Sequence, residues 1–165
     1  MNLEVPTSDA MERFGESLAR VAKAGDVIIL TGELGAGKTT FARGFGRALQ
    51  LATPMSSPTF VVARTHQSSQ AGEPPVVHID AYRIGSLAEM AELDVDAESS
   101  IVLAEWAAPY ASALSDSWLE IVVERPMATE LLDVESDEPR QVSLSAHGIS
   151  PERYDRFLAA AGDLS

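Results

Sequence analysis

One segment of this sequence matches the pattern G-x-x-x-x-G-K-[ST], in which a glycine-rich turn holds the phosphates of a nucleotide. The match spans residues 32–39, with the sequence GELGAGKT. The pattern needs a strand in front and a helix behind, because the turn points backbone N–H groups and the positive end of the helix at one anion. Residues 27–31 predict the strand and residues 39–49 predict the helix. A glycine-rich turn without a ligand is therefore the less favoured alternative.

The residues of this loop differ in their expected tasks, with ATP and Mg²⁺ as the expected cofactors. Gly35 and Gly37 let the backbone approach the phosphates where a Cβ would collide. Lys38 is expected to reach the β and γ phosphates, and the Thr39 hydroxyl to bind Mg²⁺. Thr40 adds a hydroxyl near the α phosphate. The predicted nucleotide ligands in the loop are Glu33, Gly35, Ala36, Gly37, Lys38, Thr39 and Thr40.

Two carboxylates follow apolar strands and are candidates for the magnesium site. Asp80 comes after residues 76–79, VVHI, and Glu105 after residues 101–104, IVLA. Ligands of open α/β sheets bind at the carboxyl ends of the strands, where an acid completes the Mg²⁺ and γ-phosphate chemistry. Spacing does not rank the two, and either acid alone is also explained as the cap of a turn. The candidate catalytic residues are Lys38, Asp80 and Glu105, and the candidate metal ligands are Thr39 with Asp80 or Glu105.

Three other features near these residues allow more than one interpretation. His78 lies within an apolar strand and no second histidine has metal-ligand spacing, so we interpret it as a buried histidine or as the support of a site residue. Trp106 either packs in the core or forms an exposed lid or partner contact. Residues 56–59, SSPT, form either a turn or a loop that senses the γ phosphate.

Composition narrows the class of protein. The 165 residues are 45% apolar, which favours a single domain over residues 1–165, and they include no cysteine, which excludes disulfides and thiolate metal sites. No apolar run approaches the length of a membrane span and no signal pattern opens the chain, so the protein is expected to be cytoplasmic. The net charge of −13 disfavours direct binding to nucleic acid.

Alternating strands and helices predict an α/β fold, a P-loop NTPase-like three-layer sandwich with a largely parallel central sheet and antiparallel edge strands. The first helix is expected over residues 9–24, with Asp9 and Glu12 as a capping box. Residues 64–75 are expected to be the most mobile, and residues 140–145 to form an edge strand. The remaining strands are expected at residues 60–62, 76–79, 101–104 and 118–123, and the remaining helices at residues 86–93 and from Ser150 onward.

Four blocks of the sequence together resemble the bacterial TsaE (YjeE) family of small ATPases, which assist threonylcarbamoyladenosine synthesis on tRNA. The blocks are GELGAGKTTF at residues 32–41 with Arg43 and Gly44 after it, SPTF at 57–60, HIDAYR at 78–83, and EW at 105–106. They keep the order of the family and extend to residue 106. The chain departs from the family at Asp94, where a glycine is usual.

The resemblance implies roles for individual residues and partners for the protein. Asp80 and Glu105 become an acidic pair at the Mg²⁺ and γ phosphate, and Thr59 becomes the threonine of a switch-like loop. Trp106 matches the aromatic residue after the acid, and Arg140 matches an arginine near the nucleotide. The family resemblance further implies slow ATP hydrolysis that resets an assembly of TsaD and TsaB, with tRNA held by those partners. A small-molecule P-loop kinase remains the alternative.

Overall fold

The computed structural model describes residues 1–56, 61–125 and 138–162. Its strands form one seven-stranded sheet in the order β1-β7-β6-β2-β5-β4-β3. The central strands β4, β5, β2 and β6 are parallel, while β3 on one side and β7 and β1 on the other are antiparallel. This confirms the predicted fold class. The strands are β1 (Asn2–Val5), β2 (Val27–Thr31), β3 (Ala63–His66), β4 (Val76–Asp80), β5 (Ile101–Glu105), β6 (Trp118–Glu124) and β7 (Arg140–His147).

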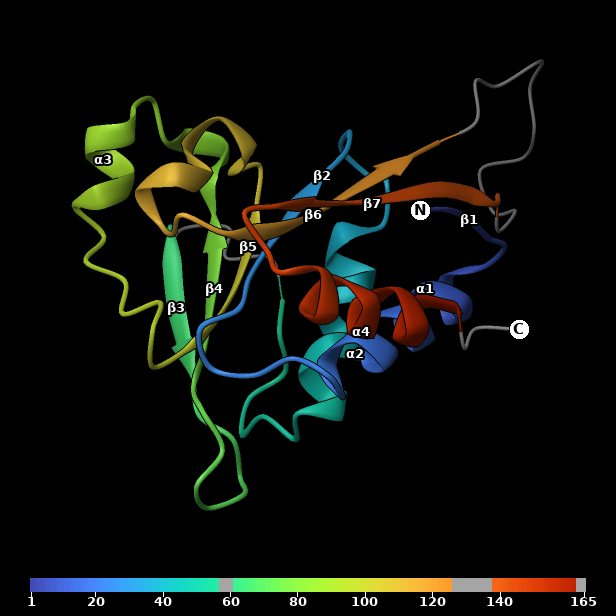
Figure 1. The fold of residues 1–165 in the computed structure, drawn as a ribbon, viewed down its shortest axis with the longest axis horizontal. Helices are drawn as coiled ribbons and strands as arrows, with labels where there is room; N and C mark the ends of the chain where they lie inside the picture. The colour runs from blue at the N-terminus through green and yellow to red at the C-terminus, as the bar shows by residue number, and fades with distance from the viewer. Residues whose placement is uncertain (57–60, 126–137, 163–165) are drawn as a thin grey trace.

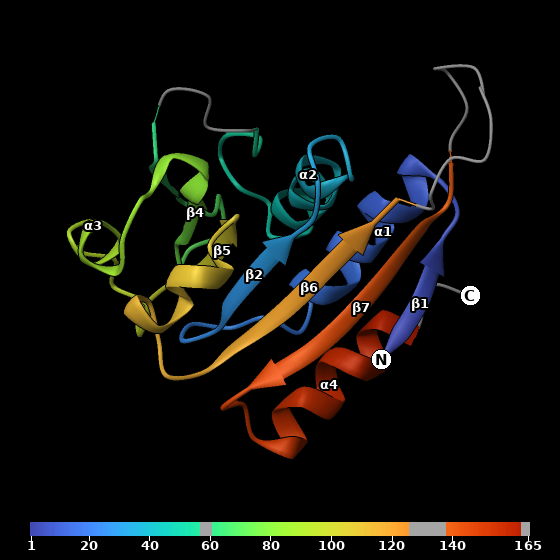
Figure 2. The same cartoon turned by 90° about the horizontal axis from the view of Figure 1, so that it is seen from above.

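Helices cover the two faces of the sheet unequally (Figures 1 and 2). One face packs against three long helices, whose apolar side chains form the larger core cluster. The other face, around β4 and β5, packs against one short helix and two 3-10 segments, which form a second cluster. The long helices are α1 (Ser8–Ala19), α2 (Lys38–Ala48) and α4 (Pro151–Gly162), and the short elements are η1 (Ala81–Arg83), α3 (Leu87–Ala91) and η2 (Ala108–Ala113). No helix in the described part of the chain is long and apolar enough to cross a bilayer.

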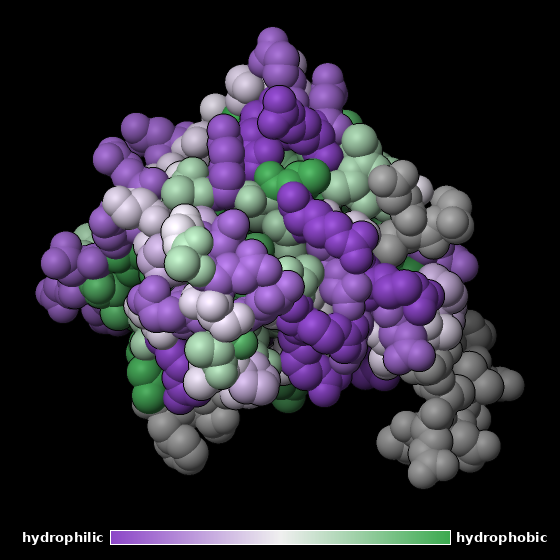
Figure 3. Space-filling view, turned by 90° about the horizontal axis from the view of Figure 1, so that it is seen from below, coloured by the Kyte–Doolittle hydropathy of each residue, from purple (hydrophilic) through white to green (hydrophobic). Residues whose placement is uncertain are grey.

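The long-helix side of the molecule is mostly hydrophilic on its surface (Figure 3). Apolar residues appear there only as small separate patches among polar ones. Ion pairs join α1 to α2 on the surface, with Arg47 bonded to Glu12 and to Glu16. Exposed pairs of this kind contribute little to stability. The firm attachment of α2 to α1 must therefore come from the packing beneath them.

Two sequence predictions about individual strands were wrong. Residues 140–145 were expected at an edge, but β7 is covered by β1, whose Asn2 pairs with Ser143. A strand was expected at residues 60–62, but Val61 and Val62 are not in a strand. Phe60 lies outside the described residues. The strand is instead β3, which overlaps the first residues of the stretch 64–75, because pairing with β4 selects those residues. Short edge strands depend on such distant pairing more than on their own composition.

The capping box predicted for the first helix was also wrong. The N-cap of α1 is Thr7, whose Oγ1 accepts a hydrogen bond from the backbone N–H of Ala10 at 3.1 Å. Glu12 turns instead toward Arg47 on α2. The helix ends at Ala19 rather than at residue 24. By contrast, α4 begins at Pro151 as the sequence predicted.

Two glycines bring the backbones of α1 and α2 together. A Cβ on Gly44 would lie 2.0 Å from the carbonyl oxygen of Glu12, and a Cβ on Gly15 would lie 2.2 Å from that of Phe41. Neither neighbour is a flexible side chain, so neither gives way easily. These contacts fix α2, the helix that starts within the glycine-rich segment 32–39.

We expect Gly44→Ala to lower the free energy of unfolding by about 3 kcal/mol, because the added methyl must push two helix backbones apart. Urea unfolding followed by circular dichroism measures this. Gly162→Ala is the matched control, since a Cβ there meets nothing within 4 Å, and its effect should stay within about 1 kcal/mol. Equal stability of the two variants would contradict the close packing of α1 on α2.

Candidate functional site

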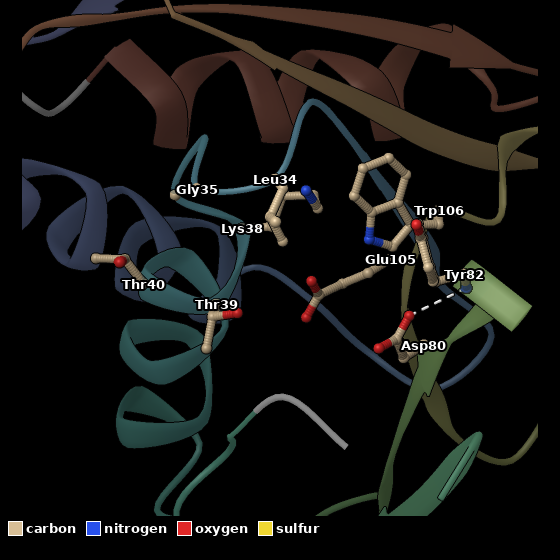
Figure 4. A pocket seen from close by; sticks show the side chains of 10 residues that line it. Leu34, Gly35, Lys38, Thr39, Thr40, Asp80, Tyr82, Glu105 and Trp106 are labelled. Carbon is tan, nitrogen blue, oxygen red and sulfur yellow. Dashed lines mark hydrogen bonds between the residues drawn. The ribbon is translucent and has the colours of Figure 1, made fainter. Parts of the chain in front are cut away.

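A cavity of about 390 Å³ opens at the carboxyl ends of β2, β4 and β5 (Figure 4). It is the place where the ligand of an open α/β sheet is expected. Most of the predicted site residues line it, but Glu33, Ala36 and Arg140 do not, and Leu34 and Tyr82 were not predicted. The lining residues are Leu34, Gly35, Gly37, Lys38, Thr39, Thr40, Asp80, Tyr82, Glu105 and Trp106.

The turn between β2 and α2 has a backbone that only glycine adopts easily. Gly35 and Gly37 have φ angles of 76° and 116°, in the left-handed region. Gly37 is also the N-cap of α2, with no side-chain hydrogen bond to the helix. The first backbone N–H groups of the helix therefore remain available at the cavity. An anion is the natural partner for such groups.

Lys38 is held by its own loop. Its Nζ donates to the carbonyl oxygens of Gly32 at 2.8 Å and Glu33 at 2.9 Å, and it lies 4.0 Å from the centre of the Trp106 ring. Burial lowers the pKa of the Lys38 ammonium, while the carboxylates of Glu105 and Asp80 act in the opposite direction. The residue is only 5% exposed, but it still lines the cavity.

The two candidate carboxylates end adjacent parallel strands, where Asp80 pairs in register with Glu105. Asp80 does cap a turn, because its Oδ1 accepts from the N–H of Tyr82 at 3.1 Å. Glu105 is buried and bonded to His78, with 3.0 Å between Oε1 and Nε2. The structure thus brings both acids to the cavity and gives each a separate protein partner.

Oxygen atoms of the kind that Mg²⁺ prefers meet in this cavity. Figure 4 shows the Thr39 hydroxyl and the carboxylates of Asp80 and Glu105 directed into the same space. In the described residues no group of three or more His, Asp or Glu side chains is arranged to hold a metal ion alone. Magnesium is usually bound by one or two carboxylates together with substrate phosphates and water. The donor set therefore fits Mg²⁺ that arrives with a phosphate ligand.

Trp106 packs against the second core cluster and also lines the cavity, whereas its role as a lid or partner contact stays a prediction. Its φ angle is 62°, an unusual conformation for a bulky residue, and strain of this kind concentrates at functional sites. Its ring contacts that of Tyr82 edge to face, with 5.3 Å between centroids. Tyr82 is 72% exposed. An aromatic residue two positions after a strand-end acid is the sequence signal that could have identified it.

Three of the predicted site residues that the structure describes do not line the cavity. Arg140 donates from Nε to the carbonyl oxygen of Ala36 at 3.1 Å, so it supports the loop from behind rather than lining the cavity. Ala36 itself is buried. Glu33 contributes its backbone carbonyl to Lys38. Thr59 lies outside the described residues.

Known proteins resemble this chain in sequence and in fold. A family model described as "Threonylcarbamoyl adenosine biosynthesis protein TsaE" matches residues 5–131. A protein from Streptomyces coelicolor named tRNA threonylcarbamoyladenosine biosynthesis protein TsaE is 40% identical over 141 residues, which cover 84% of this chain and 91% of that protein. The protein of the same name from Bacillus subtilis is 34% identical over 138 residues, 83% of this chain and 78% of its own length. The crystal structure of YdiB from Bacillus subtilis aligns with a TM-score of 0.68 and 27% identity, covering 99% of this chain and 93% of YdiB.

Proposed function

This chain belongs to the TsaE family, and from that membership and the geometry of the cavity we propose that it is an ATPase that binds and hydrolyses ATP with Mg²⁺. The family takes part in tRNA threonylcarbamoyladenosine biosynthesis, and the hydrolysis serves that pathway. One observation carries the proposal: the glycine turn with Lys38 faces the carboxylates of Asp80 and Glu105 across a single cavity. Backbone donors, a cation and acids are the parts that phosphoryl transfer requires.

Each side chain has a task that follows from its chemistry. The Lys38 ammonium exchanges the carbonyls of Gly32 and Glu33 for the β and γ phosphates. The Thr39 hydroxyl and the carboxylates of Asp80 and Glu105 would hold Mg²⁺, and the carboxylates would orient the attacking water. When bound, Mg²⁺ neutralises charge on the phosphates. The rate enhancement comes mainly from this positioning and electrostatic stabilisation.

The partners we propose are TsaD and TsaB, with tRNA reached only through them. The sequence has 12 Lys and Arg residues against 25 Asp and Glu residues, so the protein as a whole repels a polyanion. An ATPase of this charge acts on tRNA chemistry most readily through proteins that bind the RNA themselves. Pull-down with TsaD and TsaB tests this. Association that depends on ATP supports it, and a lack of any nucleotide-sensitive association counts against it.

A small-molecule kinase is the competing function. Kinases of this class close a lid with several arginines over the phosphates, whereas the residues that line the described cavity include no arginine. Analysis of the products separates the two activities, since the ATPase releases free phosphate and a kinase would transfer it to a metabolite.

Calorimetry with ATP and GTP, each with and without Mg²⁺, is the direct test of nucleotide binding. We expect ATP to bind more tightly than GTP, and Mg²⁺ to strengthen ATP binding at least about 10-fold, because the acids repel a bare triphosphate. Release of phosphate from ATP is measured in parallel. Binding that ignores Mg²⁺, or no release of phosphate with ATP bound, would contradict the proposal.

A further inference from the structure

Arg125 lies beside the turn between β2 and α2, although it is not one of the residues that line the cavity. If Gly35 carried a Cβ, that atom would lie 3.8 Å from Nη1 of Arg125. Gly35 itself lines the cavity. A guanidinium group is therefore close to the turn whose amide groups are expected to hold phosphates.

The sheet places Arg125 at this turn. β2 and β6 are parallel neighbours, with Thr31 opposite Val122, so the turn after β2 and the residue after β6 meet at the same edge (Figure 2). The backbones are in close contact there, because a Cβ on Gly32 would lie 2.3 Å from the carbonyl oxygen of Val123. Arg125 therefore approaches the turn from a strand that is packed firmly against it.

A weak ion pair holds the side chain of Arg125. Nη2 of Arg125 lies 3.3 Å from Oε2 of Glu138, and the Arg125 side chain is 45% exposed. Exposed pairs of this kind contribute little to stability, so breaking this one costs little. Glu138 would keep a partner, because Nη1 of Arg140 lies 3.6 Å from the same carboxylate oxygen. Arg125 can therefore leave Glu138 without stranding a charge.

Arg140 cannot make the same exchange as easily. Its Nε donates to the carbonyl oxygen of Ala36 at 3.1 Å, and its Nη1 donates to the carbonyl oxygen of Glu138 at 2.6 Å. These two bonds hold its guanidinium behind the turn. Of the two arginines, Arg125 is the one that is placed to move toward a ligand.

The charges in the cavity lining favour a second cation beside Lys38. The lining holds the ammonium of Lys38 and the carboxylates of Asp80 and Glu105, so its ionised side chains leave one negative charge in excess. A triphosphate chain carries several more negative charges, of which Mg²⁺ offsets only a part. A guanidinium offers phosphate oxygens two parallel N–H donors as well as its charge. An arginine at the flank of the turn supplies what the lining lacks.

We propose that Arg125 is a nucleotide-binding residue, which leaves Glu138 and donates to phosphates of the nucleotide beside Gly35. This inference rests on the proposed function, because it assumes that the cavity binds ATP. Arg125 enters from β6, whereas Asp80 and Glu105 end β4 and β5 on the other side of β2. The transferred phosphate belongs with the metal at these acids. Arg125 consequently contacts the phosphates that remain in ADP.

Calorimetry with ADP and with ATP, each in Mg²⁺, tests this contact. We expect Arg125→Ala to bind both nucleotides about 10-fold more weakly, because the lost hydrogen bonds go to phosphates that the two share. Turnover at saturating ATP should change less than about 3-fold, because the ground state and the transition state lose the same contact. Unchanged affinity for both nucleotides would overturn the inference. A loss confined to ATP, or a large fall in turnover, would overturn the assignment to the phosphates of ADP.

Arg20→Ala is the matched control for Arg125→Ala. It also removes one positive charge from an exposed ion pair, since Nη2 of Arg20 lies 3.7 Å from Oε2 of Glu16 and the Arg20 side chain is 69% exposed. Arg20 follows α1 and does not line the cavity. We expect its affinity for both nucleotides to stay within about 2-fold of the unmodified protein, because salt screens distant exposed charges. Equal losses in the two variants would indicate a general effect of net charge and overturn the contact.

Glu138→Gln tests the exchange from the side of the acid. A neutral amide competes less with phosphate for the guanidinium, so we expect ADP to bind about 3-fold more tightly. In the Arg125→Ala background the same substitution should give a smaller gain, because only the general change in charge remains. Equal gains in the two backgrounds would contradict the competition between Glu138 and phosphate.

A crystal structure of the unmodified protein with ADP and Mg²⁺ decides the contact directly, even if Arg125→Ala does not fold. We expect a guanidinium nitrogen of Arg125 within hydrogen-bond distance of a phosphate oxygen. A guanidinium that stays on Glu138, away from the phosphates, would refute the inference. The two proposals fail in distinguishable ways. A protein that binds no nucleotide refutes the proposed function and this inference with it, whereas nucleotide binding that Arg125→Ala leaves unchanged refutes the inference alone.

Discussion

Lys38→Ala is expected to bind ATP at least about 100-fold more weakly than the unmodified protein and to release no measurable phosphate, because the cation that we propose contacts the transferred phosphoryl group is gone. Lys38 is the sole lysine or arginine among the residues that line the described cavity. Arg43 bonds to Thr40 from outside and Arg125 lies near Gly35, but neither lines the cavity. Calorimetry measures the affinity, and phosphate release measures the turnover.

The control for this variant is the other lysine of the chain. Lys23 and Lys38 are the only lysines in the sequence, and Lys23 lies outside the cavity, in the turn before β2. Lys23→Ala should therefore bind and hydrolyse ATP as the unmodified protein does. Lys38→Ala with unchanged affinity and turnover would refute the assignment of the phosphate-binding loop.

Glu105→Gln is expected to lower ATP turnover on the order of 100-fold while ATP affinity changes less than about 10-fold, because the loss falls mainly on transition-state stabilisation. The neutral amide keeps the shape of the side chain, and because an amide both donates and accepts, it can still form a hydrogen bond with Nε2 of His78. The free energy of unfolding should consequently stay within about 1 kcal/mol. Asp80→Asn is expected to behave similarly, because Oδ1 still caps the turn at Tyr82.

Glu120→Gln provides a matched control for Glu105→Gln. Glu120 is also a strand glutamate bonded to a histidine, with 3.0 Å between its Oε2 and Nε2 of His147. It lies on β6 and does not line the cavity. We expect its turnover to equal that of the unmodified protein. Glu105→Gln that loses stability but keeps full turnover would show that Glu105 is structural.

The sequence predicts which residues gather at the cavity better than it predicts the edges of the sheet. The glycine turn is a local pattern whose conformation is decided by adjacent residues, and β2 has the predicted bounds of Val27–Thr31. The short strand β1 carries no comparable signal, because it exists through pairing with residues far along the chain, Val5 with Arg140. The register of β3 against β4 depends in the same way on distant pairing.

The strand-end acids show where sequence alone reaches its limit within the site. The sequence identifies Asp80 and Glu105 as strand-end acids. That they are direct neighbours follows only from the pairing of β4 with β5, which the sequence does not specify. The contact of Arg140 with the back of the loop likewise depends on how β7 lies against the turn. Asp94 has a left-handed φ of 49°, a conformation that glycine adopts more easily. The only sign of it in the sequence is that the family usually has glycine at this position.

The resting position of Lys38 affects which solutes compete for the cavity. Its ammonium already has two carbonyl partners and an aromatic face. A chloride or sulfate ion from the buffer offers little to replace those three contacts, whereas a polyphosphate chain engages the amide groups of the turn at the same time. We therefore expect the unliganded protein to bind common cellular anions only weakly at this cavity, and orthophosphate to be a weak inhibitor.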